Sequence, residues 1–477
     1  MDFTAKRATI IGLAREGTAL ARFLAQRGAQ VTVSDLKGPE ELAENIAALE
    51  GLPIRYVLGD HPPEILDGAD VLFISPGVPL EAPIVVEARR RGMPISSETR
   101  LFVELCPAPI VGITGSSGKT TTVSLVGEML KAEGLRTWVG GNIGQPLIGH
   151  LEEIESHHKV VMELSSFQLE LFGPGDWETG NWEWGIEGIS PHIAAILNIT
   201  PNHLDRHPSM EAYIEAKKNI VRYQRPGDVA VLGYDNPISR AIADECPGEV
   251  LLFSRRTEVE RGAFLRAGEI VLRVGEREER ICSVDEIKLL GEHNVDNVLA
   301  ACTLAAAAGA SPPAMARVAT TFEGVEHRLE LVRELDGVRY YNDSIATSPE
   351  RVVAALKSFE APIVLLAGGR DKHLPWDEFA RWVRRRVKHL VLFGEAAPLI
   401  EEVVRGEAYS RPSTPGPYPL TLVRCADLEE AVAVAHRLAE PGDVVLLSPG
   451  GTSFDAFRDF AERGRRFKEL VKGLRAS

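Results

Sequence analysis

Short apolar runs alternate with helical stretches along the whole chain, and the first 35 residues set the pattern. An apolar run at 8–11 leads into a turn with Gly12 and Gly17, then a stretch of helical period and a second apolar run ending at Asp35. This order is typical of a β-strand, a helix and a parallel β-strand. A later run, 71–74, ends in the turn Ser75-Pro76-Gly77. We predict a Rossmann-like domain at 1–107.

Two further blocks repeat this alternation. The second block, 108–326, places strands at 160–164, 193–198 and 229–232 and ends in an alanine-rich helix, 295–308. The third block, 327–477, places strands at 338–342, 363–366, 390–393 and 444–447. Strands that alternate with helices favour parallel sheets. The sequence therefore predicts an α/β protein of three domains: a Rossmann-like N-terminal domain, a central P-loop ATPase-type domain and a Rossmann-like C-terminal domain.

The composition is that of an ordinary soluble globular protein. The 477 residues are 44% hydrophobic and carry a formal net charge of −15. This acidic balance argues against a nucleic-acid binder, which needs a basic face. No early segment has the form of a signal peptide, and no apolar run approaches the ~18 residues of a membrane span. Five scattered cysteines suit a reducing compartment. We expect a cytoplasmic protein that binds small molecules, with no nucleic-acid or membrane partner, and we expect a monomer.

The segment GITGSSGKTTT at 112–122 carries the most specific signal in the chain. It follows an apolar pair and precedes a helical stretch at 123–133, so it predicts a strand, a tight glycine loop and a helix. That order presents backbone N–H groups to a phosphate. The strict phosphate-loop pattern would place glycine where this chain has Ile113, so the loop is a variant. The residues predicted to hold ATP are Gly115, Ser116, Ser117, Gly118, Lys119, Thr120 and Thr121.

Further polar side chains follow predicted strands or open helices. Glu163 in ELSSFQLE ends a strand, where a carboxylate can bind Mg²⁺. His203 in NITPNHLDRH lies in a polar loop, and Lys217 lies on a helix that begins near residue 210. Asn294 and Asn297 in GEHNVDN are three residues apart and share one helix face. Taken singly, each has a structural alternative: a helix cap, a loop contact or a helix start.

Together these motifs resemble the Mur ligase family, whose members form amide bonds in peptidoglycan precursors with ATP. The resemblance covers nearly the whole chain, and the family's phosphate loop lacks the early glycine in the same way. GGNIG at 140–144, ELSSFQLE at 163–170 and LSPGGTSFDAF at 447–457 look most like the members that add D-glutamate to UDP-N-acetylmuramoyl-L-alanine. The resemblance thus implies an ADP-producing acid–amino-acid ligase of cell wall biogenesis.

The resemblance also implies roles for individual residues. Lys119 would bind the phosphates of ATP, and Glu163 with Thr120 and Thr121 would hold one Mg²⁺. His203 would hold a second Mg²⁺ together with Lys217, which in the family is carbamylated and so offers an anionic oxygen. The nucleotide of ATP would be contacted by Asn294, Asn297, Arg328 and Asp343. The UDP-substrate would be contacted by Asp35, Ser75, Pro76, Gly77 and Asn142. The incoming amino acid would be contacted by Thr347, Lys372, Ser453, Phe454 and Phe460.

The implied chemistry suits these residue types. The substrate carboxylate attacks the γ-phosphate of ATP to give an acyl phosphate, and the amine of the amino acid then displaces phosphate. The carboxylate and the γ-phosphate are both anions, so bringing them together requires Lys119 and Mg²⁺ to neutralise their charge. The acyl phosphate must also be kept from water, which suits closure of a mobile third domain.

The chain departs from the family pattern at three places. Ile345 stands where many members have lysine, and Asn202 stands where an aspartate is common. The segment 173–188 is longer than usual and carries three tryptophans, for which an exposed hairpin is the favoured interpretation.

Three alternatives stay open at this point. A related group of ligases adds L-glutamate to the same precursor, and some of its members also lack the lysine. Folylpolyglutamate synthase shares the architecture but has no need of the nucleotide-sugar domain at the front of this chain. A non-catalytic nucleotide-binding protein would not need a second metal site.

Overall fold

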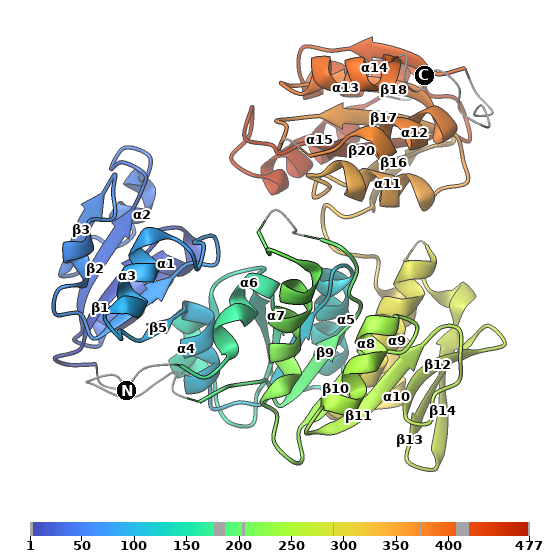
Figure 1. Cartoon of the computed structure of the whole chain (residues 1–477). Helices are drawn as coiled ribbons and strands as arrows, with labels where there is room; N and C mark the ends of the chain where they lie inside the picture. Colours follow the sequence, from blue (N-terminus) through green and yellow to red (C-terminus); the bar gives the residue numbers. More distant parts are fainter. Residues whose placement is uncertain are drawn as a thin grey trace. The chain divides into compact units, whose positions relative to one another are not determined.

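Three β-sheets, each with helices packed on it, make up the computed structural model (Figure 1). It describes residues 3–175, 187–202, 206–289, 291–372, 374–406 and 419–475. The expected three-domain α/β fold is confirmed. The elements of the three sheets fall within 1–107, 108–326 and 327–477, while the boundary residues themselves stay predictions. The chain forms two compact units, of which one holds residues 1–287 with 293–321 and the other 288–292 with 322–477.

The N-terminal sheet has five parallel strands in the order β3-β2-β1-β4-β5. The strands are β1 (Arg7–Ile11), β2 (Gln30–Asp35), β3 (Ile54–Leu58), β4 (Val71–Ile74) and β5 (Ile95–Ser96). The helices are α1 (Arg15–Gln26), α2 (Ala43–Ala47), α3 (Pro83–Arg90) and α4 (Glu98–Leu105), with the 3₁₀ turn η1 (Pro63–Leu66). The strand order reverses beside β1, so the turns after β1 and β4 adjoin, which is where such sheets bind ligands.

The middle sheet has nine strands in the order β14-β13-β12-β11-β10-β9-β6-β8-β7. The strands are β6 (Ile110–Thr114), β7 (Thr137–Gly141), β8 (Lys159–Glu163), β9 (Ile193–Ile196), β10 (Val229–Gly233), β11 (Glu249–Ser254), β12 (Gly262–Arg266), β13 (Glu269–Val274) and β14 (Arg277–Ser283). The α-helices are α5 (Lys119–Ala132), α6 (Ser166–Leu169), α7 (Met210–Arg222), α8 (Pro237–Ala241), α9 (Glu292–Ala307) and α10 (Pro312–Thr321). The 3₁₀ turns are η2 (Leu147–Glu153), η3 (Glu170–Phe172), η4 (Ile242–Glu245) and η5 (Val284–Glu286). Strands β12 to β14 pair antiparallel and extend one edge.

The C-terminal sheet has six strands in the order β15-β16-β20-β17-β18-β19. The strands are β15 (Glu330–Leu335), β16 (Val338–Asn342), β17 (Ile363–Gly368), β18 (Val387–Phe393), β19 (Thr421–Arg424) and β20 (Val444–Gly450). The helices are α11 (Pro349–Lys357), α12 (Asp377–Arg386), α13 (Ala397–Arg405), α14 (Leu428–Leu438) and α15 (Phe460–Gly473). The four predicted strands are present, whereas β15, which pairs antiparallel with β16, and the edge strand β19 were not predicted.

The C-terminal sheet has a layer of helices on each face. The alternation of side chains along its strands explains this arrangement. Leu365 and Leu446 pack with helices α11, α12 and α13, while their neighbours Val364 and Val445 pack with α14 and α15. Successive side chains of a strand point to opposite faces, so a strand that is apolar throughout needs cover on both. The continuous apolar runs of these strands therefore match a parallel sheet that is covered on both faces.

One hydrophobic cluster continues from the N-terminal sheet into the middle sheet. It includes Phe102 of α4 and Ile148 of η2, both fully buried. This shared core accounts for the first two sheets forming one compact unit.

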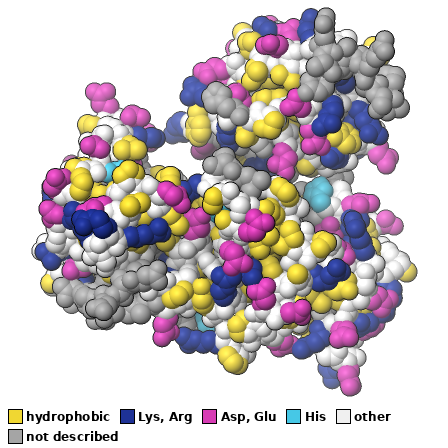
Figure 2. Space-filling model, viewed as in Figure 1, with side chains coloured by type: hydrophobic (Ala, Val, Ile, Leu, Met, Phe, Trp, Pro, Cys, Tyr) yellow, Lys and Arg dark blue, Asp and Glu magenta, His cyan; other side chains and the backbone are white. Residues whose placement is uncertain are grey.

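The surface is mixed in charge. On the face that Figure 2 displays, Lys and Arg side chains are interspersed with Asp and Glu, and apolar side chains are scattered among them. Within the described ranges, no helix is long and apolar enough to span a bilayer.

Candidate functional site

The carboxyl ends of four neighbouring strands gather the polar residues of the middle sheet. Strands β9, β6, β8 and β7 are adjacent and parallel. Their ends carry Asn198, Thr114, Glu163 and the turn at Asn142, respectively. Motifs far apart in the sequence therefore meet at one edge, as expected for a parallel sheet.

The phosphate loop connects β6 to α5 in the predicted order. Helix α5 begins at Lys119, four residues earlier than the sequence indicated, because Gly118 at its N-cap adopts the left-handed conformation with φ of 84°. Asn198 holds the loop from the next strand: its Oδ1 accepts from the backbone N–H of Ser117 at 3.0 Å. The loop is thus shaped before any ligand binds, and its N–H groups precede a 14-residue helix.

Substitution of Gly118 by alanine is expected to weaken nucleotide binding by about 10-fold or more, or roughly 1.4 kcal/mol. A Cβ there would lie 2.3 Å from Oδ1 of Asn297, and the positive φ is strained for alanine. Titration with a non-hydrolysable ATP analogue measures the effect. Gly134→Ala is the control, because it also has a positive φ but no atom within 4 Å of its added Cβ. Equal affinities of the two variants would contradict this role of Gly118.

Two lysines converge on one carbonyl oxygen of the loop. Lys119 Nζ donates to the carbonyl of Gly115 at 2.9 Å, and Lys217 Nζ donates to the same oxygen at 3.1 Å. Lys217 also donates to the hydroxyl of Thr114 at 3.1 Å and is only 1% exposed. Burial and the nearby Lys119 hold the pKa of Lys217 well below its usual value, although Glu163 opposes the shift. An anion placed here would relieve the repulsion between the two amines.

Glu163 is the carboxylate of this cluster. Its Oε2 accepts from the hydroxyl of Thr120 at 2.8 Å, and its Oε1 accepts from the side-chain amide of Asn142 at 2.9 Å. A carboxylate and a hydroxyl are the hard oxygen donors that Mg²⁺ prefers, so this donor set fits the predicted ion. The hydroxyl that reaches Glu163 belongs to Thr120, whereas Thr121 is buried within α5.

Asn294 and Asn297 lie on one face of α9, as predicted. Asn297 Nδ2 donates to Asn294 Oδ1 at 2.9 Å, and both side chains are buried. The Oδ1 of Asn297 faces Gly118. Asn297 therefore borders the phosphate loop and Asn294 bonds to Asn297, and their contact with adenine stays a prediction. His203 and the tryptophans at 177, 182 and 184 lie outside the described residues, as does most of the proline-rich segment 411–419, which the sequence predicts to be a surface loop.

Asp35 and the Ser75-Pro76-Gly77 turn, which are predicted to hold the UDP-substrate, come together at the switch point of the N-terminal sheet, whereas Asn142 lies beside Glu163. Asp35 accepts from the backbone N–H of Leu13 at 2.7 Å. Ser75, the first residue of the Ser75-Pro76-Gly77 turn, donates to the carbonyl of Gly12 at 3.4 Å. The turn after β1 also contacts the GGNIG segment, because Arg15 donates to the carbonyl of Gly144 at 2.7 Å. Arg15 thus connects the switch point to the segment that carries Asn142, and contact of these residues with the substrate stays a prediction.

The C-terminal unit carries its own polar cluster at the ends of β16 and β20. Asp343 is buried; its Oδ2 accepts from Ser448 at 2.8 Å and its Oδ1 from the N–H of Leu329 at 3.3 Å. Burial raises the pKa of Asp343 to about 7, although Ser448 and Arg328 oppose the shift. Arg328 and Asp343 are therefore neighbours, as expected, and their approach to the nucleotide stays a prediction.

Raising the pH from about 4 to 7 is expected to destabilise the C-terminal unit, because the buried carboxyl of Asp343 must stay protonated in the folded state or become charged. The folded state holds this proton up to about pH 7, whereas the unfolded chain releases it near its ordinary value of 3.8. The stability contribution is thus present at acid pH and falls by up to about 1.4 kcal/mol per pH unit through that window. Asp343→Asn removes this dependence, so its denaturant midpoint should rise relative to wild type as the pH rises. Hydrogen exchange of peptides from the C-terminal unit shows that the transition belongs to this unit. A difference in denaturant midpoint between the two proteins that stays constant with pH would refute the prediction.

Two of the predicted amino-acid contacts form a pair. Lys372 Nζ donates to the hydroxyl of Thr347 at 3.4 Å. Partial burial and the cations Arg351 and Arg463 lower the pKa of Lys372. Ser453 is buried, Phe454 is 61% exposed, and the carbonyl of Phe460 accepts from Ser344 at 2.7 Å. The 342–347 and 451–460 loops that carry the predicted residues are thus joined.

Sequence reasoning missed three residues that shape these sites. Arg463, which is fully buried, donates to the carbonyls of Ser344, Gly451 and Thr452 and so ties the two C-terminal loops together. Tyr213 and Asn198 hold the phosphate loop in the other unit. An arginine or tyrosine inside an amphipathic helix has no local signature, whereas the position of Asn198 just after a strand could have indicated a role.

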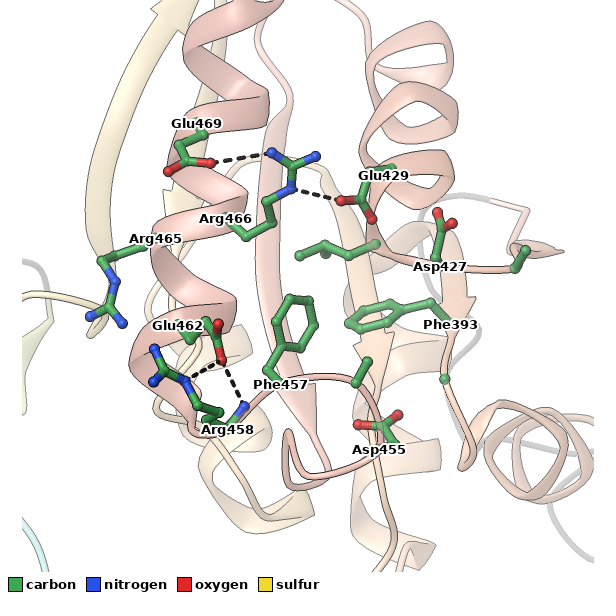
Figure 3. Close-up of a pocket in the computed structure, with 14 residues that line it drawn as sticks. Phe393, Asp427, Glu429, Asp455, Phe457, Arg458, Glu462, Arg465, Arg466 and Glu469 are labelled. Atoms are coloured by element: carbon green, nitrogen blue, oxygen red, sulfur yellow. Dashed lines mark hydrogen bonds and ion pairs between the residues drawn. The ribbon is translucent and has the colours of Figure 1, made fainter. Parts of the chain in front are cut away.

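Two other features lack the character of a ligand site. A hollow of about 480 Å³ in the C-terminal unit is lined by apolar residues such as Phe393 and Phe457 and by charged residues, several of which pair with one another. Figure 3 shows Arg466 between Glu429 and Glu469, to which its distances are 2.7 and 3.2 Å. Glu155, His157 and His158 lie close enough to share a metal ion. However, Nδ1 of His158 accepts two N–H groups, from Glu155 and Trp138, so the lone pair of this nitrogen is already used.

Three family models match the chain, one for each sheet. They are described as "Mur ligase MurD-like, N-terminal domain" at residues 6–97, "Mur ligase middle domain" at 113–305 and "Mur ligase, glutamate ligase domain" at 327–451. A UDP-N-acetylmuramoylalanine–D-glutamate ligase of Symbiobacterium thermophilum is 48% identical over 98% of both chains. The enzyme of that name from Acetivibrio thermocellus is 45% identical over 99% of this chain and 97% of its own.

Solved structures agree on the fold. The UDP-N-acetylmuramate-alanine ligase MurC of Thermotoga maritima has a TM-score of 0.59 at 20% identity, covering 98% of this chain and 99% of its own. MurF of Acinetobacter baumannii has a TM-score of 0.57 at 17% identity, covering 97% of this chain and 93% of its own.

Proposed function

The chain belongs to the Mur ligase family, and we propose that it joins D-glutamate to UDP-N-acetylmuramoyl-L-alanine, converting ATP to ADP and phosphate. The full-length relatives at 40–48% identity carry the name of this activity. The observation that carries the proposal is the meeting of Lys119, Lys217 and Glu163 at the ends of β6 and β8. A site that only bound a nucleotide would not need the second, buried lysine.

The reaction has two steps, for which the residues supply binding and charge. A carboxylate oxygen of the substrate forms a bond to the γ-phosphorus as the bond to ADP breaks. The amine of glutamate then attacks the acyl carbon, loses a proton, and inorganic phosphate leaves. Lys119 binds the phosphates, and the loop N–H groups before α5 orient them.

The oxygens of Glu163 and Thr120 are the proposed ligands of Mg²⁺, which when bound neutralises phosphate charge. Lys217 fits the proposed carbamate because burial and the nearby Lys119 lower its pKa, which favours the neutral amine. Such an amine can add to CO₂ with release of one proton, and the product is an anionic oxygen donor close to Lys119. His203 is proposed as a further ligand on the strength of its motif alone.

Two cations beside one loop support glutamate as the incoming amino acid. Lys372 bonds to Thr347, and Arg351 donates to the carbonyl of Ile345 at 2.9 Å. Two cations from elsewhere in the C-terminal unit therefore contact the short loop 345–347, although residue 345 itself brings no charge. Glutamate carries two carboxylates, so a pair of cations suits it better than a neutral amino acid.

The proposal is tested by phosphate release from ATP and Mg²⁺ with UDP-N-acetylmuramoyl-L-alanine and either D- or L-glutamate. We expect release with D-glutamate that depends on the nucleotide sugar, and at least about 100-fold less with L-glutamate. Faster turnover with L-glutamate would make the chain the L-glutamate-adding ligase. No release with either isomer would support a non-catalytic nucleotide-binding protein.

A further inference from the structure

Arg206 and His207, at the start of the segment that leads into α7, touch three parts of the first unit. Arg206 donates to the carbonyl of Val78, in the turn that follows Ser75-Pro76-Gly77, at 2.8 Å. It also lies 3.7 Å from Oε2 of Glu170 in η3, and its guanidinium is 5.3 Å from the ring centre of Phe167 in α6. Arg206 therefore ties the turn after β4 to the segment that follows Glu163.

His207 continues this connection into the core. The side chain is 2% exposed, with Nδ1 3.3 Å from Oε1 of Glu170 and Nε2 2.9 Å from the hydroxyl of Ser166. Its ring stacks on Phe167, with centroids 5.4 Å apart and planes at 21°. The carboxylate of Glu170 thus contacts both residues, Arg206 through Oε2 and His207 through Oε1. Burial raises the pKa of this carboxyl, while Arg206 opposes the shift.

Tyr213 connects His207 to the phosphate loop. The two ring centres are 5.1 Å apart. The Ser116 hydroxyl donates to the carbonyl of Thr200 at 2.9 Å, so the Tyr213 hydroxyl, 3.0 Å away, must donate to Ser116. Lys217 Nζ lies 4.8 Å from the centre of the Tyr213 ring. Tyr213 therefore packs against both the phosphate loop and the buried lysine.

We propose that Arg206 and His207 are positioning residues that couple the turn predicted to bind the UDP-substrate to Lys217 and the phosphate loop. The inference rests on the proposed function. The substrate is held at one end by the N-terminal sheet and reacts at the other end against ATP, so its carboxylate reaches the γ-phosphate only if the two sites keep a fixed separation. A displacement of about 1 Å can cost up to 100-fold in rate without a change in binding.

The test compares Arg206→Met, His207→Gln and the double variant. Each single variant should lower kcat by about 10-fold or more. The dissociation constants of UDP-N-acetylmuramoyl-L-alanine and of a non-hydrolysable ATP analogue, measured separately by calorimetry, should stay within about twofold. The double variant should be no more than about twofold slower than the worse single variant, because both residues act through Glu170. Glu170→Gln, which keeps the side-chain shape, should reproduce the loss.

Matched controls separate positioning from simple loss of packing. His158→Gln removes another buried histidine, at the opposite end of β8, and Arg240→Met removes an arginine that lies 5.0 Å from a tyrosine ring centre in the same unit. Both should keep wild-type kcat, and thermal melts of all variants report folding. Single variants with kcat within twofold of wild type would overturn the proposal, as would losses that multiply in the double variant. Wild-type protein without turnover would instead refute the proposed function.

Discussion

Replacement of Lys217 by alanine is expected to lower D-glutamate-dependent phosphate release by at least about 100-fold. The side chain is buried beside Lys119 and bonds to the hydroxyl of Thr114 and the carbonyl of Gly115. Alanine removes both the amine that is proposed to form a carbamate and the group that fixes the loop. Steady-state assays with saturating ATP and nucleotide sugar measure the loss.

The neighbouring lysine is the matched control for this variant. Lys218 lies on the same helix and pairs with Glu215 and Glu245, so Lys218→Ala should keep activity within about twofold of wild type. A short carboxylic acid added to Lys217→Ala should restore part of the activity if an anionic oxygen is what the site needs. A Lys217→Ala enzyme that keeps a tenth or more of wild-type activity would contradict the assigned role.

Replacement of Arg463 by methionine is expected to destabilise the C-terminal unit by about 3–5 kcal/mol. The guanidinium is fully buried and satisfies the carbonyls of Ser344, Gly451 and Thr452. Burial lowers its pKa to about 10, so it remains charged at neutral pH. Methionine fills the volume but removes the donor from the carbonyls of Ser344 and Gly451, each at a cost of about 1–3 kcal/mol. The carbonyl of Thr452 still accepts from the backbone N–H of Arg370 at 2.9 Å.

The effect should extend to function, because these loops carry Asp343 and Ser453. We expect a higher KM for D-glutamate in the fraction of Arg463→Met that stays folded. Arg466→Met, on the same helix, removes a surface ion pair with Glu429 and should cost less than about 1 kcal/mol. Denaturant melts followed by hydrogen exchange measure both variants. Equal stabilities would show that the buried guanidinium does not hold the loops.

The sequence predicted those strands and helices whose residues form a recognisable local pattern. The runs that became β1, β4, β8 and β20 are mostly apolar and mostly buried, because both faces of a parallel sheet are covered. Strand β14 carries the letters REERICS, and four of its residues are exposed, so its pattern resembles that of a loop. Edge strands of this kind are set by pairing with a neighbour, which a single sequence does not display.

The same distinction, between residues in a local motif and residues placed by tertiary packing, applies to the site. Lys119 and Glu163 lie in motifs where the chain must turn at a strand end, and the structure brings them to one edge of the sheet. Tyr213 and Arg463 instead come from helices and reach loops roughly 100 residues away in sequence. Their partners are fixed only by tertiary packing, so no spacing in the sequence could indicate them. Helix α5 began before its predicted start because the left-handed Gly118, and not the apolar pattern, sets its first turn.

The central claim is that the γ-phosphate passes to the carboxylate of the nucleotide sugar before the amide forms. UDP-N-acetylmuramoyl-L-alanine with both carboxylate oxygens labelled with ¹⁸O tests it directly. In the proposed reaction one labelled oxygen becomes the bridge of the acyl phosphate and leaves with phosphate, and the other stays in the new amide. Mass spectrometry should therefore find one ¹⁸O in each phosphate released with D-glutamate. Unlabelled phosphate, formed at the same rate as ADP, would contradict the account.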